Sequence, residues 1–252
     1  MSSPLSRVPP DSAILGLGHR LRMASALPAL RGRDGRVPRA VSTALRDTAL
    51  GRIPAEERAW IDRIEASGRR IAAGLEIPVA VRWMSLPPVW GRFLTRLVRE
   101  LAPGSALELG TGFGLSTAYQ AAALDLNDRG HIVSFDVEDM LAIAAPGLER
   151  IGLGSRTDLV GGDIDATLPP RLDGIAPVDY ALIDHDHTEA GTLRAFDALL
   201  PHLAPGAAVV FDDIGWTEAM RRAWRAVGDR EGVAETIGLR RVGVAVIAGG
   251  DE

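Results

Sequence analysis

The sequence predicts an α/β fold built on a doubly wound, mainly parallel seven-stranded sheet, and three observations support it. From residue 105 onward, short apolar segments alternate with helical stretches, which is typical of a parallel sheet covered on both faces. A glycine-rich turn follows the first apolar segment directly. The last two apolar segments are joined only by Leu239-Arg240-Arg241, which predicts a C-terminal antiparallel hairpin at one sheet edge.

The predicted elements follow from this alternation. Strands are expected at 105–109, 131–136, 157–160, 178–183, 207–211, 234–239 and 242–248. Helices are expected between them at 115–126, 138–152, 188–203 and 216–228. Every strand is short and apolar, as buried strands of a parallel sheet are.

The N-terminal part has a different composition. Residues 1–40 are rich in Pro, Gly, Ser and Arg, which predicts a poorly ordered or loosely docked arm. Pro54 followed by two glutamates favours a helix start, and that helix should run to about residue 73, with another over 88–101. We therefore divide the chain into an N-terminal arm and helical extension over 1–80 and a sheet domain over 81–252.

Composition excludes several classes of protein. Cysteine is absent, which rules out disulfides and zinc–thiolate sites and agrees with a cytoplasmic location. All 28 basic residues are arginines, so a lysine base or Schiff base is excluded. The sequence has no window of 18 uninterrupted apolar residues, so we expect no membrane span. Residues 1–100 carry 17 Arg against 9 acids, but the charges are interleaved, so we expect a solvated surface and no nucleic-acid partner.

The most specific motif is the stretch Ala106-Leu107-Glu108-Leu109-Gly110-Thr111-Gly112-Phe113-Gly114. Alternate glycines allow a sharp turn and let a ligand lie against bare main chain at a helix N-terminus. The spacing is G-x-G-x-G, and Leu115 stands where nicotinamide dinucleotide sites have their third glycine. Glu108, two residues before the first glycine, is placed to reach a cationic ligand.

This pattern resembles motif I of class I S-adenosylmethionine (SAM)-dependent methyltransferases, and the resemblance implies a Rossmann-like fold that binds SAM. Asp136 ends the second strand, where a carboxylate can accept both ribose hydroxyls. The family's adenine loop corresponds to Gly161-Gly162-Asp163. Upstream, the stretch from Met84 to Gly91 resembles the entry of catechol O-methyltransferases. The expected cofactor-binding residues are Met84, Ser85, Glu108, Gly110, Gly112, Ser116, Asp136, Asp163, Asp184 and His185.

Three carboxylates are predicted to meet at the ends of two neighbouring strands. Asp184 follows the fourth strand, and Asp212 and Asp213 follow the fifth. Such a cluster repels itself unless it is protonated or binds a cation, and an all-oxygen ligand set suits Mg²⁺. The resemblance implies a metal-dependent O-methyltransferase, although Asp213 stands where catechol and caffeoyl-coenzyme A enzymes have asparagine. That acid pair is closer to macrolide-sugar O-methyltransferases.

His187 is the expected catalytic base. It lies three residues after Asp184, at the position of the catalytic lysine of catechol enzymes and of a histidine in the macrolide-sugar enzymes. A histidine titrates near neutral pH, so it can take a proton from a hydroxyl. Trp216, close after the acid pair, is the best candidate among the tryptophans for the wall of an apolar substrate pocket.

The sequence thus predicts a SAM-dependent enzyme that methylates a hydroxyl of a small molecule, for example a specialised metabolite with a diol or catechol, aided by a divalent metal. Three alternatives stay open. The enzyme could methylate oxygen or nitrogen without metal, the sheet could belong to a nicotinamide-dependent oxidoreductase, or the protein could bind SAM without catalysis. A homodimer is also an open expectation.

Overall fold

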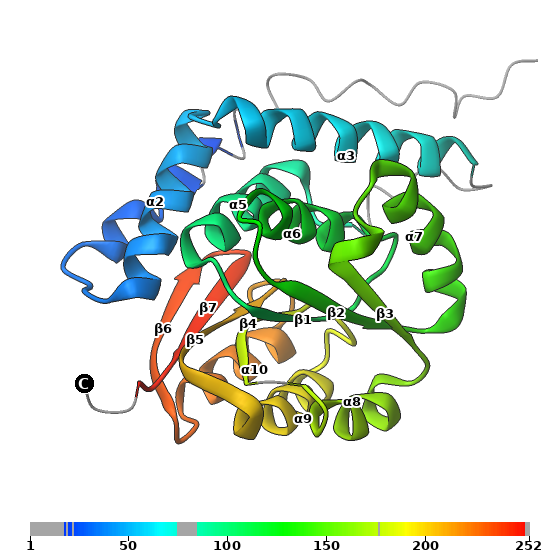
Figure 1. Ribbon diagram of the computed structural model, residues 1–252. Coiled ribbons are helices and arrows are strands. Elements are labelled where there is room, and N and C mark those ends of the chain that lie inside the picture. Colours follow the sequence, from blue (N-terminus) through cyan, green and yellow to red (C-terminus); the bar gives the residue numbers. More distant parts are fainter. Residues whose placement is uncertain (1–17, 19, 22, 75–84, 176, 250–252) are drawn as a thin grey trace, which may run out of the picture.

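The computed structural model describes Gly18, Arg20, Leu21 and residues 23–74, 85–175 and 177–249. It contains one seven-stranded sheet with the strand order β3-β2-β1-β4-β5-β7-β6 (Figure 1). The first five strands pair in parallel, and β7 pairs antiparallel with both β5 and β6. The strands are β1 (Ser105–Leu109), β2 (His131–Asp136), β3 (Thr157–Gly161), β4 (Val178–Ile183), β5 (Leu203–Phe211), β6 (Val233–Leu239) and β7 (Val242–Ile247). The predicted fold class is confirmed.

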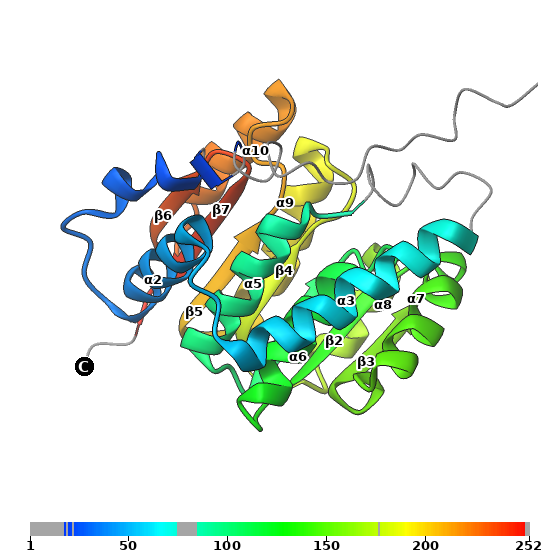
Figure 2. The ribbon, with the colours of Figure 1, turned by 90° about the horizontal axis from the view of Figure 1, so that it is seen from above.

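Helices cover both faces of the sheet (Figure 1). One face carries α2 (Arg36–Leu50), α5 (Pro88–Leu101), α6 (Leu115–Leu126) and α7 (Glu138–Ile151). The other carries α8 (Ile164–Leu172), α9 (Glu189–Leu199) and α10 (Glu218–Gly228). Short 3₁₀ turns occupy Leu27–Leu30, Gly154–Arg156 and Leu200–His202. Helix α3 (Ala55–Gly74) forms an outer layer, running over α6 toward α7, while α2 lies beside α5 (Figure 2).

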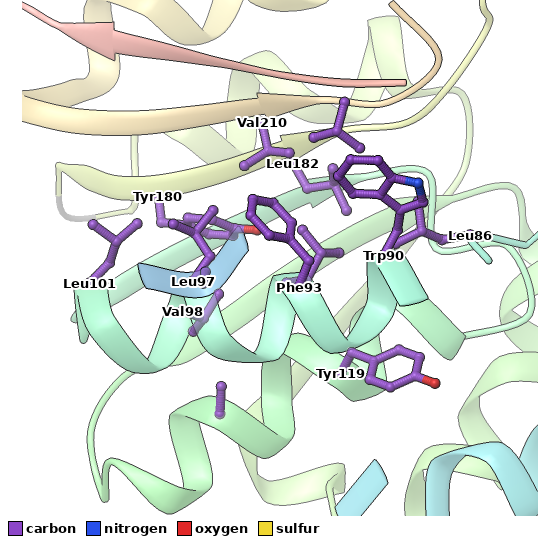
Figure 3. Close-up of a cluster of buried hydrophobic side chains, with 14 of the residues drawn as sticks. Leu86, Trp90, Phe93, Leu97, Val98, Leu101, Tyr119, Tyr180, Leu182 and Val210 are labelled. Atoms are coloured by element: carbon purple, nitrogen blue, oxygen red, sulfur yellow. The ribbon is translucent and has the colours of Figure 1, made fainter. Parts of the chain in front are cut away.

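Alternation along each strand divides the core into two layers. Tyr180 and Leu182 of β4 face the α5 side, whereas Ala181 and Ile183 face the α9 side. Helix α5 fills the first layer with Trp90, Phe93, Leu97 and other apolar side chains that point at the sheet (Figure 3). Because helices cover both faces of the central strands β1 and β4, a ligand can approach these strands at their ends.

The N-terminal segment differs from the expected loose arm. Met23 is 1% exposed, and Val41 and Leu45 of α2 are fully buried in the layer shared with α5. The expectation of a loosely docked arm is therefore wrong for residues 23–40. The proposed domain boundary at residue 80 lies between 75 and 84, outside the described residues.

Buried charge ties the extension to the sheet domain. Arg96 of α5 donates to Glu57 of α3 at 2.5 Å, to Asp47 of α2 at 3.0 Å and to Glu100 at 2.8 Å. Burial raises the pKa of Glu57, opposed by the hydrogen bond and charge of Arg96. Among the described helices, none is long and apolar enough to cross a membrane.

Candidate SAM and methyl-transfer site

The glycine turn leaves β1 at the point where the strand order reverses between β1 and β4. Gly110 has a φ of +101°, and a Cβ there would lie 2.0 Å from the main-chain oxygen of Asp184. Gly112 has a φ of +53°. Glycine is therefore required at 110, both for the backbone angle and for the close approach of β4. Helix α6 begins at Leu115, directly after the turn.

Glu108 is buried beneath this turn instead of facing a ligand. Its Oε1 accepts a hydrogen bond from Gln120 at 2.7 Å, and its Oε2 accepts hydrogen bonds from Ser134 at 2.6 Å and from Thr117. Burial raises the pKa of Glu108, while these hydrogen bonds oppose the rise. This differs from the sequence-based expectation of a carboxylate that reaches a cationic ligand: Glu108 joins β1, β2 and α6.

Asp136 closes the turn from the neighbouring strand. Its Oδ2 accepts a hydrogen bond from the Gly112 amide at 2.7 Å, and its Oδ1 accepts one from the Val137 amide at 2.7 Å. The carboxylate is only partly buried, so lone pairs remain for a ligand. Asp163 is exposed and caps the N-terminus of α8 by accepting a hydrogen bond from the Asp165 amide at 3.0 Å. It therefore has a capping role whether or not it also meets a cofactor.

Two other predicted cofactor residues each carry a buried polar atom that makes no hydrogen bond within the part of the chain that the structure describes. Ser85 Oγ and His185 Nε2 are buried and find none within the described part of the chain. A buried polar atom without a partner is costly, so such atoms point to a missing ligand or water. Burial lowers the pKa of His185, which favours a neutral ring. Ser116 is buried at the start of α6, and Met84 lies outside the described residues.

The three predicted metal ligands lie at the ends of β4 and β5, but an arginine holds the pair after β5. Arg241 Nε donates to Asp212 Oδ1 at 2.9 Å, and Arg241 Nη2 donates to Asp212 Oδ2 at 2.6 Å. The same Nη2 lies 3.3 Å from Asp213 Oδ1. Within the described residues, no group of three or more Asp, Glu or His side chains is arranged to hold a metal ion.

Burial and mutual repulsion affect the protonation of the cluster. Burial, followed by the charge of Asp212, raises the pKa of Asp184 well above its ordinary value. The same two causes raise the pKa of Asp213, and Arg241 opposes both shifts. The three carboxylates therefore interact electrostatically, as expected from the sequence. The cation that contacts Asp212 and Asp213 is the guanidinium of Arg241.

Sequence reasoning missed Arg241. It lies in the turn between β6 and β7, 28 residues after Asp213 in the chain. The turn is fixed to the loop after β5 because the Ile214 amide donates to the Arg241 main-chain oxygen at 2.8 Å. The predicted hairpin contained the only available signal, two arginines at its tip, but nothing local shows that this tip meets the end of β5.

His187 lies next to the acid cluster. Its Nε2 is 3.5 Å from Asp184 Oδ1, and its ring meets the Trp216 ring edge-to-face with centroids 5.4 Å apart. The Trp216 residue is 65% exposed. Asp186, His187 and Asp213 all have left-handed backbone angles, with φ of +58°, +43° and +53°. Such angles in non-glycine residues are strained and gather at functional sites.

Comparison with known proteins finds matches among methyltransferases. A family model described as a methyltransferase domain matches residues 107–214. A catechol O-methyltransferase of Niastella koreensis is 32% identical over 132 residues, which are 52% of this chain and 58% of that relative. The chain therefore spans little more than half the length of the curated relative it matches.

Two solved structures share the fold. The O-methyltransferase TomG of Streptomyces achromogenes, involved in tomaymycin synthesis and solved with SAM, has a TM-score of 0.60 and 23% identity over 74% of this chain and 90% of that one. An O-methyltransferase of Bacillus cereus solved with S-adenosylhomocysteine has a TM-score of 0.57 and 18% identity over 92% of this chain and 99% of that one. The stretch matched by the methyltransferase-domain model, residues 107–214, contains the glycine turn and the ends of β4 and β5 at the switch point of the sheet.

Proposed function

We propose that this protein transfers the methyl group of SAM to a hydroxyl of a small molecule. The observation that carries the proposal is the glycine turn at residues 110–114, tied by the Gly112 amide to Asp136 at the open end of β1 and β2. A turn of bare main chain beside a carboxylate suits a nucleoside with a polar tail. The family match over residues 107–214 supports the same donor.

The donor's parts are assigned to named residues. Asp136 accepts the ribose hydroxyls, and Asp163 accepts from the adenine amino group. Ser85, Ser116 and His185 take the methionine end, which supplies partners for the buried Ser85 Oγ and His185 Nε2. Glu108 acts indirectly, by fixing the start of α6 through Thr117 and Gln120.

His187 is the proposed base. Its Nε2 faces Asp184, so we assign proton uptake to Nδ1. The acceptor oxygen gives its proton to His187 and attacks the methyl carbon. The carbon–sulfur bond breaks, and its electron pair stays on sulfur, which gives S-adenosylhomocysteine and a methyl ether. Base assistance of this kind contributes about 10²–10⁴-fold in rate, and positioning supplies much of the rest.

The expected divalent metal has weaker support than SAM. Asp184, Asp212 and Asp213 supply the oxygen atoms that Mg²⁺ prefers. However, both oxygens of Asp212 accept hydrogen bonds from Arg241, so the residues as arranged do not fit a metal ion. We therefore assign no step of the methyl transfer to a metal ion.

The acceptor site is assigned to the exposed Trp216 and its edge contact with His187. An exposed aromatic ring next to a base suits a flat, hydroxylated acceptor such as a catechol or another phenolic metabolite. The name of the Niastella koreensis relative, a catechol O-methyltransferase, supports this class of substrate. A cytoplasmic location and a homodimer remain predictions.

The test is calorimetry with SAM and, in parallel, with NAD, followed by a screen of catechols, sugars and polyketides for uptake of labelled methyl. We expect one SAM site per chain and no NAD binding. Binding of NAD without SAM would replace this proposal with the oxidoreductase alternative. Tight SAM binding with no transfer to any acceptor class would favour the non-catalytic alternative.

A further inference from the structure

The pairing of Arg241 with Asp212 is built into the fold and is not a chance surface contact. Asp212 is 1% exposed, and both of its oxygens accept from one guanidinium at 2.9 and 2.6 Å. A two-bond fork of this kind is the strongest geometry between arginine and a carboxylate. Arg241 is thus held where a buried carboxylate needs a positive charge.

The backbone fixes the arginine in place. The Arg241 main-chain oxygen accepts from the Ile214 amide at 2.8 Å, which joins the hairpin turn to the residue after Asp213. A Cβ on Gly215 would lie 2.7 Å from the Arg240 main-chain oxygen, so the turn and the loop after β5 touch directly. The loop that carries the acids and the turn that carries the cation therefore form one unit.

Part of the guanidinium remains free to act. Arg241 donates hydrogen bonds to Asp212 through Nε and Nη2, while Nη1 has no hydrogen bond to any residue that the structure describes. The side chain is 31% exposed. Electrostatic interactions link the same cluster to Asp184, and Asp213 in turn interacts with His187. A donor with spare capacity thus belongs to the same acid cluster that the proposed base contacts through Asp184.

We propose that Arg241 takes the place of a divalent metal in this site: its guanidinium neutralises Asp212 and Asp213, and its Nη1 donates a hydrogen bond to the acceptor oxygen. The inference rests on the proposed methyl transfer. A metal ion entering the cluster would have to break both bonds of the fork and lie next to a fixed positive charge. The guanidinium supplies one positive charge and orients the acceptor oxygen for attack.

The first experiment measures metal binding, which is independent of methyl transfer. Mn²⁺ is titrated into the full-length protein and followed by electron paramagnetic resonance, with and without SAM. We expect no site tighter than millimolar. Stoichiometric binding of Mn²⁺ in the micromolar range would overturn the proposal.

The second experiment uses Arg241→Met, with Arg240→Met as the matched control because it removes the same charge from the adjacent exposed position. We expect Arg241→Met to gain a Mn²⁺ signal that Arg240→Met lacks, because the acids lose their internal cation. Arg241→Met together with Asp212→Asn keeps the shape without a buried unpaired charge, and should show no such signal. If neither Arg241 variant folds, the wild-type titration still decides the proposal.

Activity separates this inference from the proposed function. With an acceptor identified, wild-type turnover should change less than twofold on adding a chelator or Mg²⁺, and Arg241→Lys should fall at least tenfold because lysine cannot form the fork. Loss of turnover with chelator, restored by Mg²⁺, would overturn the inference and leave the methyltransferase assignment standing. Absence of SAM binding would instead refute the proposed function.

Discussion

The main-chain oxygen of Asp184 occupies the space that a Cβ on Gly110 would need, at 2.0 Å. The ends of β1 and β4 are therefore as close as main chain allows at the switch point of the sheet. The Asp184 amide also donates to the Leu109 oxygen at 2.8 Å, so a hydrogen bond joins the proposed donor turn to the proposed catalytic strand end.

Gly110→Ala should abolish SAM binding and lower the melting temperature, because the new methyl group collides with backbone that cannot move alone. The matched control is Gly152→Ala, since Gly152 has a similar φ of +86° but has no atom within 4 Å of the position that a Cβ would take. The control should cost about 1 kcal/mol of stability and leave SAM affinity intact. Equal effects of both changes would show that backbone angle alone, and not the contact with Asp184, explains the glycine.

Asp136→Ala should weaken SAM binding at least about tenfold, equivalent to about 1.4 kcal/mol, because the ribose loses its acceptor and the Gly112 amide loses its tether. Calorimetry measures the change. The control is Asp158→Ala on the adjacent strand β3, where the exposed carboxylate pairs with Arg171. Unchanged affinity in Asp136→Ala would refute the ribose assignment.

His187→Ala should lower the turnover number by about 10²–10⁴-fold while changing the SAM dissociation constant little, because the base acts on the acceptor proton. His131→Ala serves as the control, since His131 is exposed at the opposite end of β2. Steady-state kinetics and calorimetry separate the two quantities. A large loss of SAM affinity with normal turnover would make His187 a binding residue.

Trp216→Ala should raise the KM for an aromatic acceptor about three- to tenfold, since aromatic contacts are worth about 0.5–1.5 kcal/mol, and Trp216→Phe should recover most of it. The control is Trp60→Phe on α3, where the ring packs under Arg63 at 5.1 Å. An unaltered KM in Trp216→Ala would place the acceptor elsewhere.

Glu108→Gln should change how stability depends on pH. The folded-state pKa of Glu108 is raised above 4.5, so the folded protein binds its proton more tightly than the unfolded chain does. That contribution is present at low pH and is lost as the pH rises from about 4.5 through the raised pKa. Relative to Glu108→Gln, the wild type should therefore lose melting temperature as the pH rises above about 4.5. Glu231→Gln, at an exposed position, should run parallel to the wild type.

Local pattern was sufficient for the sheet. The predicted strands 105–109, 131–136 and 178–183 have the bounds that the structure gives, because each is a short apolar run closed by a turn or an acid. Strand β5 begins at Leu203 and not at the predicted residue 207, because Pro205 and Gly206 are residues that usually indicate a turn. Helix α2 was missed because Pro38 and Gly35 read as a loop, although a proline in the first turn loses no helical hydrogen bond.

The site was predicted less evenly. The glycine turn, Asp136, and the positions of Asp184, Asp212, Asp213 and His187 at strand ends all followed from sequence order, because parallel strands end on one side of the sheet. Whether a carboxylate faces a ligand or the interior did not follow. Glu108 proved fully buried, with its oxygens bound to Thr117, Ser134 and Gln120.

By itself, the sequence determined the order of the elements, the sheet type and the edge where chemistry-bearing residues gather, since these depend on local apolar periodicity and on the direction of the strands. Only the tertiary structure decided which positive charge pairs with the acid cluster. Arg241 reaches Asp212 across 29 positions of chain because an antiparallel hairpin folds its tip onto the end of β5. Such a contact depends on long-range packing, which no short stretch of sequence encodes.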